Sequence, residues 1–343
     1  MNYELFRTFA ALIAKKAMEK QQEMSLMKPR SYRSVLIAGF RLYTENFRRL
    51  FKASWQMALL YAVACGIFGT LSVIKLPEIV VAIIQQLTVY HGILPEAFIQ
   101  YLITFAEIMG LLIVAIATLA LASATILNKL KEHKETDVIS IPPHWFSASP
   151  QMMGRSLKGI FFTLLVILIP VILMMLAIAG AEAFSPQFIS KHIITLVATF
   201  CIGLLIILLL ALPLFYVLMK YLMEAPCSYW HTLSSSYSRG MRHWGSLFVV
   251  FFVSTLLVEI AALIIMLPAH ILSIANQQAQ MGVLIGDPLG MPSYMSTLTF
   301  ITFMLCCFIE FYVSQVMLVH NYYIYGAIES KEQENEQQKL DIQ

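Results

Sequence analysis

Six long runs of apolar residues divide the chain, and polar or charged segments separate them. Each run has about the 20 residues, rising roughly 1.5 Å each, that a helix needs to cross the hydrocarbon core of a bilayer. Backbone polar groups inside lipid must be paired within their own segment, so we expect helices. The predicted spans are residues 55–74, 102–127, 159–180, 193–219, 247–268 and 298–320. The pattern predicts an all-α, polytopic membrane helical bundle of six transmembrane helices arranged as three hairpins.

An amphipathic stretch, residues 31–52, precedes the first span. Its apolar residues recur at steps of three and four, with charged residues on the other faces. These apolar residues are Leu36, Phe40, Tyr43, Phe47 and Leu50. We expect an interfacial helix, which acts either as a simple topology anchor or as a helix that docks a partner or senses lipids. A second interfacial helix is expected at Phe6 to Ala14, because this stretch lacks the basic start and cleavage site of a signal peptide.

Shorter apolar-faced segments follow the first and fifth spans, at residues 78–90 and 269–281. Each comes directly after a proline, Pro77 or Pro268. Because proline is favoured at the start of a helix, we expect a new helix after each one, lying on the opposite surface of the membrane.

The C-terminal residues 328–343 are rich in Glu and Gln and contain few apolar residues. This composition is typical of a solvated or disordered tail. The chain is therefore expected to divide into an N-terminal cytoplasmic or interfacial segment (1–30), a six-span membrane domain (31–327) and a polar cytoplasmic tail.

The first and third hairpins resemble each other in sequence, with short matches in the same order. The matched groups are Gly39-Phe40-Arg41 with Gly240-Met241-Arg242, Leu76-Pro77 with Leu267-Pro268, and Ile103-Thr104-Phe105 with Ile301-Thr302-Phe303. Internal repeats are common in transporter folds, and they also arise by plain duplication of a helical hairpin. We expect two copies of one hairpin in parallel orientation.

Positive charge is sorted to one side of the spans. None of the 23 Lys and Arg residues lies inside a span, and only Lys75 and Lys191 fall on the side opposite to the rest. Short loops rich in Lys and Arg stay in the cytoplasm, so both termini and the loops near 128–158 and 220–246 are expected there. The chain is 59% apolar and 13% charged. It therefore fits a multi-pass protein of a bacterial cytoplasmic (inner) membrane, with anionic lipid rather than nucleic acid as its partner.

The cysteines and histidines do not form the patterns of a disulfide framework or a metal site. Four cysteines lie in spans and Cys227 lies in a cytoplasmic loop, so none falls in an extracytoplasmic segment. The histidines lie at span ends or in loops, whereas an intramembrane iron oxygenase needs several clustered within the spans. No H-E-x-x-H, G-x-S-x-G or phosphate-loop motif occurs. We expect no metal, no cofactor and no enzymatic activity.

Two carboxylates inside the spans, Glu259 and Glu310, form the candidate intramembrane polar site. They lie on consecutive antiparallel helices, where placing a charged carboxylate costs about 3 kcal/mol. Thr255 and Ala262 share a helical face with Glu259, and Ser314 shares one with Glu310, so we expect both carboxyls to face the bundle interior. They form either a proton- or cation-coupling site or a pair of protonated carboxyls that donate interhelical hydrogen bonds.

Pro170 and Pro213 lie inside the third and fourth spans. A proline can break a helix to line a transport site, but a kink accommodated by neighbouring helices is the commoner arrangement. We expect kinks.

Polar and aromatic residues gather on the expected cytoplasmic side, in the amphipathic stretch and in the loop 220–246. Trp and Tyr at head-group depth are typical of interfacial packing, and the same composition fits the docking of a protein partner or a lipid head group. The candidate contact residues are Arg41, Arg48, Arg49, Glu224, Trp230, His231, Arg239 and Arg242.

The segment from Tyr221 to Gly240 resembles a group of bacterial membrane proteins. Tyr221 to Glu224 is a tyrosine-glutamate stretch, Leu233 to Ser236 is serine-rich, and Gly240 leads into the next span. This order is similar to that of bacterial six-span integral membrane proteins, among them the membrane domain of glycerophosphodiester phosphodiesterases, and it is most similar to uncharacterised Bacteroidales-type membrane proteins. The resemblance implies the six-span architecture and a bacterial inner membrane, and no activity, because no phosphodiesterase domain is attached.

These features predict a non-enzymatic integral membrane protein that organises the membrane, handles lipids or serves as a subunit of a larger membrane complex. The expected partners are membrane lipids, together with a membrane-protein partner or a second copy of the chain. The alternative is a small secondary transporter in which Glu259 and Glu310 couple protons or cations.

Overall fold

The computed structural model describes residues 25–89, 95–141, 149–184, 188–224, 227–285 and 292–342, and these form helices and their connections without a strand. The expected helix at Phe6 to Ala14 lies outside the described residues. The helices are α2 (Tyr32–Val89), α3 (Pro95–Thr136), α4 (Pro150–Phe184), α5 (Phe188–Met223), α6 (Tyr229–Arg242), α7 (Trp244–Ile285) and α8 (Met295–Ile342).

Each of the six predicted spans lies inside one long helix. These six helices, α2, α3, α4, α5, α7 and α8, are each long and apolar enough to cross a membrane. The all-α class and the multi-pass membrane architecture are therefore confirmed. Pro170 and Pro213 lie inside continuous helices, α4 and α5, so neither proline breaks its span.

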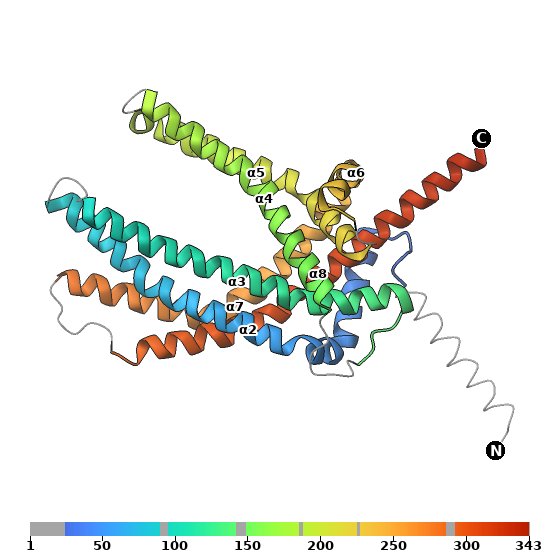
Figure 1. Cartoon of the computed structure of the whole chain (residues 1–343), viewed down its shortest axis with the longest axis horizontal. Helices are drawn as coiled ribbons and strands as arrows, with labels where there is room; N and C mark the ends of the chain where they lie inside the picture. Colours follow the sequence, from blue (N-terminus) through green and yellow to red (C-terminus); the bar gives the residue numbers. More distant parts are fainter. Residues whose placement is uncertain are drawn as a thin grey trace, which may run out of the picture.

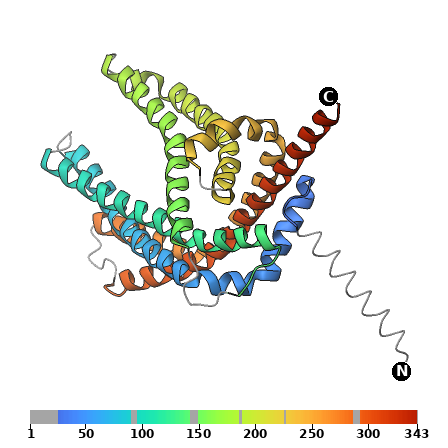
Figure 2. The same ribbon diagram turned by 45° about the vertical axis from the view of Figure 1, so that its right-hand side comes forward.

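The helices pair as the three predicted hairpins, α2 with α3, α4 with α5, and α7 with α8, and α2 packs most extensively against α8. Both ribbon views show α2, α3, α7 and α8 running together as a four-helix bundle, while the α4–α5 hairpin diverges from it as a separate arm (Figures 1 and 2). Bundle and arm meet at the end where α2 begins and α8 ends. We call this the basic end, because most lysines and arginines lie there.

The predicted breaks after Pro77 and Pro268 are wrong, because α2 and α7 run through both prolines. A proline removes the hydrogen bond to the carbonyl four residues earlier. For Pro77 that carbonyl belongs to Val73, and it accepts a hydrogen bond from the side-chain amide of Asn276 on α7 at 2.6 Å. A neighbouring helix thus replaces the lost bond, so residues 78–89 continue α2 instead of starting a surface helix.

The first part of α2 covers the predicted amphipathic helix, and Figure 1 shows it bending away from the line of the rest. Tyr43 and Leu50 are buried, and the Tyr43 hydroxyl donates to the Tyr312 carbonyl of α8 at 2.6 Å. Phe40 and Phe47 on the same stripe are more than one-third exposed. Part of the apolar face therefore packs against α8, and part stays open.

The tail, which was expected to be solvated or disordered, is helical over the described residues. α8 continues as a helix through Ile342. Glu329 and Glu332 are buried, whereas residues 333–341 are exposed. The composition of the tail correctly indicated a solvated end, but the first turns after residue 328 are held by partners from α5, α6 and the α6–α7 turn.

The best-packed core lies at the basic end and not in the middle of the spans. Every residue of α8 from 319 to 330 is buried, at a point where α2, α3, α5 and α7 surround it. Among the largest fully buried side chains are Tyr216, Tyr322, Tyr323 and Tyr325. This core fixes the helix ends that form the site described next.

Candidate functional site

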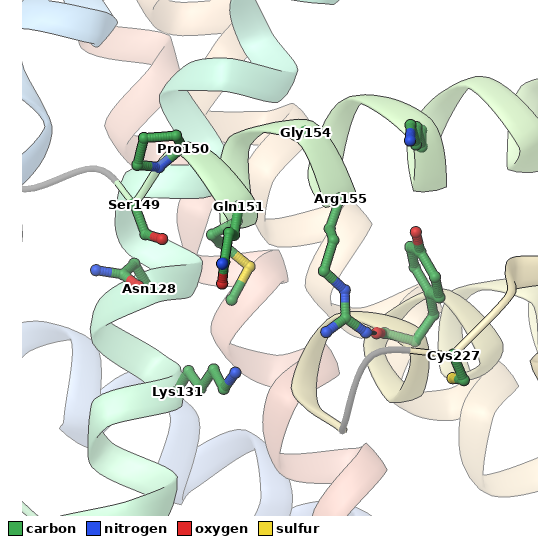
Figure 3. A pocket seen from close by; sticks show the side chains of 11 residues that line it. Asn128, Lys131, Ser149, Pro150, Gln151, Gly154, Arg155 and Cys227 are labelled. Atoms are coloured by element: carbon green, nitrogen blue, oxygen red, sulfur yellow. Dashed lines mark hydrogen bonds between the residues drawn. The ribbon is translucent and has the colours of Figure 1, made fainter.

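A pocket of about 530 Å³ opens at the basic end, between the end of α3, the start of α4 and the end of α5. We call it the basic pocket. Figure 3 shows the side chains of Lys131 from α3 and of Gln151 and Arg155 from α4 extending toward a common space. Lys158, one turn further along α4, and Tyr221 of α5 complete this wall.

The basic pocket carries three cations and no acidic group among the described residues that line it. Lys131 and Lys158 have no hydrogen-bond or ion-pair partner in the described part of the chain. Lysines on a surface are normally solvated, but two unpaired lysines beside an arginine in one concavity produce a local positive potential. The pocket therefore favours an anion.

Arg155 is held in place by the end of α5. Its guanidinium donates to the carbonyl oxygens of Glu224, at 3.0 Å, and of Tyr221, and it stacks 4.9 Å from the centroid of the Tyr221 ring. The last carbonyls of a helix have no partner within the helix, so an arginine at this position satisfies them. Arg155 thus joins α4 to α5 and adds a fixed charge to the pocket.

The start of α4 forms another part of the pocket wall, through Ser149, Pro150 and Gln151. The first backbone N–H groups of a helix lack internal acceptors, and the helix dipole is positive there. An oxyanion in the basic pocket would face these donors together with the cations. The arrangement suits a phosphate or carboxylate group.

The two intramembrane carboxylates lie apart from the basic pocket, within the spans of α7 and α8. Glu310 is half-buried, whereas Glu259 is exposed, so the prediction that both face the bundle interior is wrong for Glu259. The buried side chains of Ser254 and Ala262 mark the inner face of α7. Glu259 and Glu310 are still close enough to interact electrostatically.

The eight predicted contact residues do not form one site, because they are divided between α2 and the α5–α6 region. On α2, Arg41 pairs with Glu45 at 3.1 Å, Arg49 donates to the Ile139 carbonyl at 2.8 Å, and Arg48 is exposed. The chain itself therefore occupies two of these three arginines.

The other five predicted residues are mostly engaged as well. Glu224 accepts from the Tyr325 hydroxyl at 3.3 Å. Arg239 and Arg242 pair with Glu336 and Glu332 of α8, at 3.4 and 3.5 Å. Trp230 packs its ring against Phe162 while staying 47% exposed, and His231 is exposed.

Sequence reasoning missed Lys131, Arg155 and Lys158 as site residues. In the sequence they contributed only to the charge bias that sets topology, because they are split between the end of one helix and the start of the next. The available signal was Gly154-Arg155 directly before a span, with lysines on both sides of the loop. Only the packing of α3 against α4 brings these charges together.

No group of three or more His, Cys, Asp or Glu side chains in the described parts of the chain is arranged to hold a metal ion. All five cysteines are free thiols. Comparison with known protein families, with characterised proteins and with solved structures finds no match. The geometry of the basic pocket is thus the main basis for a functional proposal.

Proposed function

We propose that the protein is a non-enzymatic lipid-handling protein of the bacterial cytoplasmic membrane, and that its basic pocket binds the phosphate of an anionic phospholipid. One observation carries this proposal: Lys131, Arg155 and Lys158 line a single concavity that has no acidic residue in its described wall. The proposed ligand is a lipid of the cytoplasmic leaflet.

The position of the pocket along α4 supports a lipid rather than a soluble anion. Lys158 directly precedes residue 159, where the third predicted span begins, and Arg155 lies about one turn before it. With the proposed orientation, this is the depth of the lipid head groups. Anionic lipids attract each nearby Lys or Arg by about 1 kcal/mol.

The test measures lipid binding to the purified full-length protein by native mass spectrometry. Dioleoyl phosphatidylglycerol is titrated against dioleoyl phosphatidylcholine, which has the same chains and no net charge. The wild type should prefer phosphatidylglycerol, and Lys131→Gln/Lys158→Gln should weaken that binding roughly tenfold or more, since two contributions of about 1 kcal/mol are lost.

The matched control is Arg48→Gln/Lys52→Gln, which removes two exposed charges from α2 at the same end of the molecule. It should leave the preference for phosphatidylglycerol almost unchanged. Equal binding of both lipids by the wild type, or an equal loss in both double variants, would reject the basic pocket as the lipid site.

The same proposal places the protein in membrane organisation, alone, as a homo-oligomer or as a subunit of a larger membrane complex. The exposed α4–α5 arm supports a role with partners, because its apolar windows are only 6% buried within the chain. Purification in a mild detergent, with identification of co-eluting proteins, tests this part. A lone monomer without a partner would contradict the subunit role.

A small secondary transporter is the second candidate, and the electrostatic influence of Glu259 on Glu310 within the spans favours it. If these carboxyls couple ion movement, wild-type proteoliposomes should dissipate an imposed proton or sodium gradient. Glu259→Gln/Glu310→Gln should then return the rate to that of protein-free vesicles. Glu78→Gln, an exposed carboxylate outside the spans, is the control. Equal rates in wild type and double variant would exclude this role for the pair.

A further inference from the structure

A second concavity lies deeper along the same two helices as the basic pocket. It has a volume of about 550 Å³, and α4, α5 and α6 form its walls. Val166 and Pro170 of α4 and Leu210 and Leu214 of α5 make it mainly apolar, and Ser234 lies on the α6 side. We call it the apolar groove.

The spacing between the two cavities follows from the helices that they share. Lys158 of the basic pocket and Val166 of the apolar groove are eight residues apart on α4, and Tyr221 and Leu214 are seven apart on α5. At about 1.5 Å per residue, each step is roughly 10 to 12 Å along the helix. The hydrocarbon core of one leaflet is about 15 Å thick, so the groove lies at acyl-chain depth when the basic pocket lies at the head groups.

Aromatic side chains lie between the two cavities along α4, and we call them the aromatic wall. The Tyr229 ring stacks on Phe162 of α4 at 5.6 Å between centroids and meets the Tyr221 ring edge-on at 5.5 Å. Its hydroxyl shares a 2.8 Å hydrogen bond with Thr163. Burial raises the pKa of the Tyr229 hydroxyl, and the hydrogen bond with Thr163 opposes this shift. The residue is therefore neutral at physiological pH, so the aromatic wall adds no charge between the two cavities.

We propose that one phospholipid occupies both cavities, with its phosphate in the basic pocket and an acyl chain in the apolar groove. The glycerol backbone would cross the aromatic wall beside Trp230, whose indole is nearly half-exposed. Indole rings favour this boundary between head groups and chains. The inference rests on the proposed function and adds the ligand class: a lipid with a full-length chain, rather than any phosphate-bearing molecule.

Photo-crosslinking tests whether one molecule fills both cavities. The probe is phosphatidylglycerol with a diazirine at mid-chain, and the labelled peptides are identified by mass spectrometry. Labelling is expected on α4 near Val166 to Pro170 and on α5 near Ile207 to Leu214. In Lys131→Gln/Lys158→Gln, labelling of the groove should fall by about the same factor as phosphatidylglycerol binding. The reason is that the acyl chain enters the groove only when the head group of the same lipid binds the basic pocket.

A second variant fills the groove without touching the cations. Ser234→Trp places a large ring at an exposed position in the groove wall, and Ser235→Trp, also exposed on α6 and not part of that wall, is its control. Ser234→Trp should abolish groove labelling and should reduce the affinity for dioleoyl phosphatidylglycerol to that for the dihexanoyl form. Ser235→Trp should preserve both.

The outcomes separate this inference from the function on which it rests. If the lysine variant loses its preference for phosphatidylglycerol while groove labelling is unchanged, the basic pocket binds lipid, but the apolar groove holds a different molecule and the inference fails. Full groove labelling in Ser234→Trp would overturn it as well. If the wild type has no preference for phosphatidylglycerol, the proposed function itself fails.

Discussion

The buried carboxylate of Glu329 accepts hydrogen bonds from two side chains of α5. The Tyr216 hydroxyl and the Lys220 ammonium both donate to one of its oxygens, the lysine at 2.7 Å. Both members of the ion pair are nearly buried, with side chains 11% and 9% exposed. Such a pair adds little net stability by itself, but removing Glu329 leaves the Lys220 ammonium with only the partly exposed Glu224 carboxylate, 3.5 Å away, as a counter-charge.

Glu329→Ala should therefore lower the free energy of unfolding by about 1 to 3 kcal/mol, because the Tyr216 hydroxyl and the Lys220 ammonium both lose their acceptor. Lys220→Met/Glu329→Leu removes both charges and should recover most of that loss. Thermal unfolding of the purified protein, followed by tryptophan fluorescence, measures both effects, and Glu334→Ala at an exposed position of the same helix is the control. A Glu329→Ala variant as stable as Glu334→Ala would refute this account of the pair.

The sequence could not have indicated the role of Glu329. The residues that follow it along the chain are mainly glutamates and glutamines of a polar tail, and composition describes only such local surroundings. The contact with Lys220 joins residues more than 100 positions apart. The cations of the basic pocket could not be predicted either, because they come together only when separate helices pack. Glu259 and Glu310 could be identified as candidates, because a charged residue inside an apolar run is visible in the sequence alone.

In α2 and α5, a side chain from another helix replaces the backbone hydrogen bond that a proline removes. In α2 the carbonyl of Val73, which loses its partner at Pro77, accepts from Asn276. In α5 the carbonyl of Leu209, four residues before Pro213, accepts from the indole N–H of Trp244 at 2.9 Å. Lipid offers no donor, so these side chains are the replacement that an unpaired carbonyl at this depth requires.

Asn276→Ala should destabilise the protein by about 1 to 2 kcal/mol, because the Val73 carbonyl is left without a donor. In a Pro77→Ala background the helix regains its own N–H for that carbonyl, so the same substitution should have a clearly smaller effect. A double-mutant cycle by thermal unfolding measures this coupling, with Gln277→Ala as the exposed neighbour control. Additive effects of the Asn276 and Pro77 changes would show that the amide does not compensate for the proline.

The hydrogen bonding of the backbone in lipid explains which features of the helices could be predicted from the sequence. All six spans could be located because each apolar run must satisfy its own backbone inside lipid. Helix ends could not be located as well, since Pro77 and Pro268 look like boundaries when read alone. The donor that lets α2 continue, Asn276, comes from a helix about 200 positions later.

The whole molecule combines a packed basic end with two diverging apolar parts. In α3 the apolar window is 44% buried, but in α4 and α5 it is only 6% buried. Figures 1 and 2 show the reason, since the part of the α4–α5 arm farthest from the basic end leaves the four-helix bundle and has no neighbour among the other described helices. Lipid or a partner must therefore cover most of the arm, which is where the apolar groove also lies.

The orientation of this assembly can be tested with its own thiols, because Cys227 is the one cysteine outside the predicted spans and it is exposed. If Lys and Arg keep the basic end in the cytoplasm, a membrane-impermeant maleimide should label Cys227 in inside-out vesicles and not in spheroplasts. Cys227→Ser should abolish the labelling. Lys75→Cys in that background should be labelled from the outside only, since Lys75 directly follows the first predicted span. Labelling of Cys227 in intact spheroplasts would invert the topology and would remove the cytoplasmic leaflet as the source of the proposed lipid.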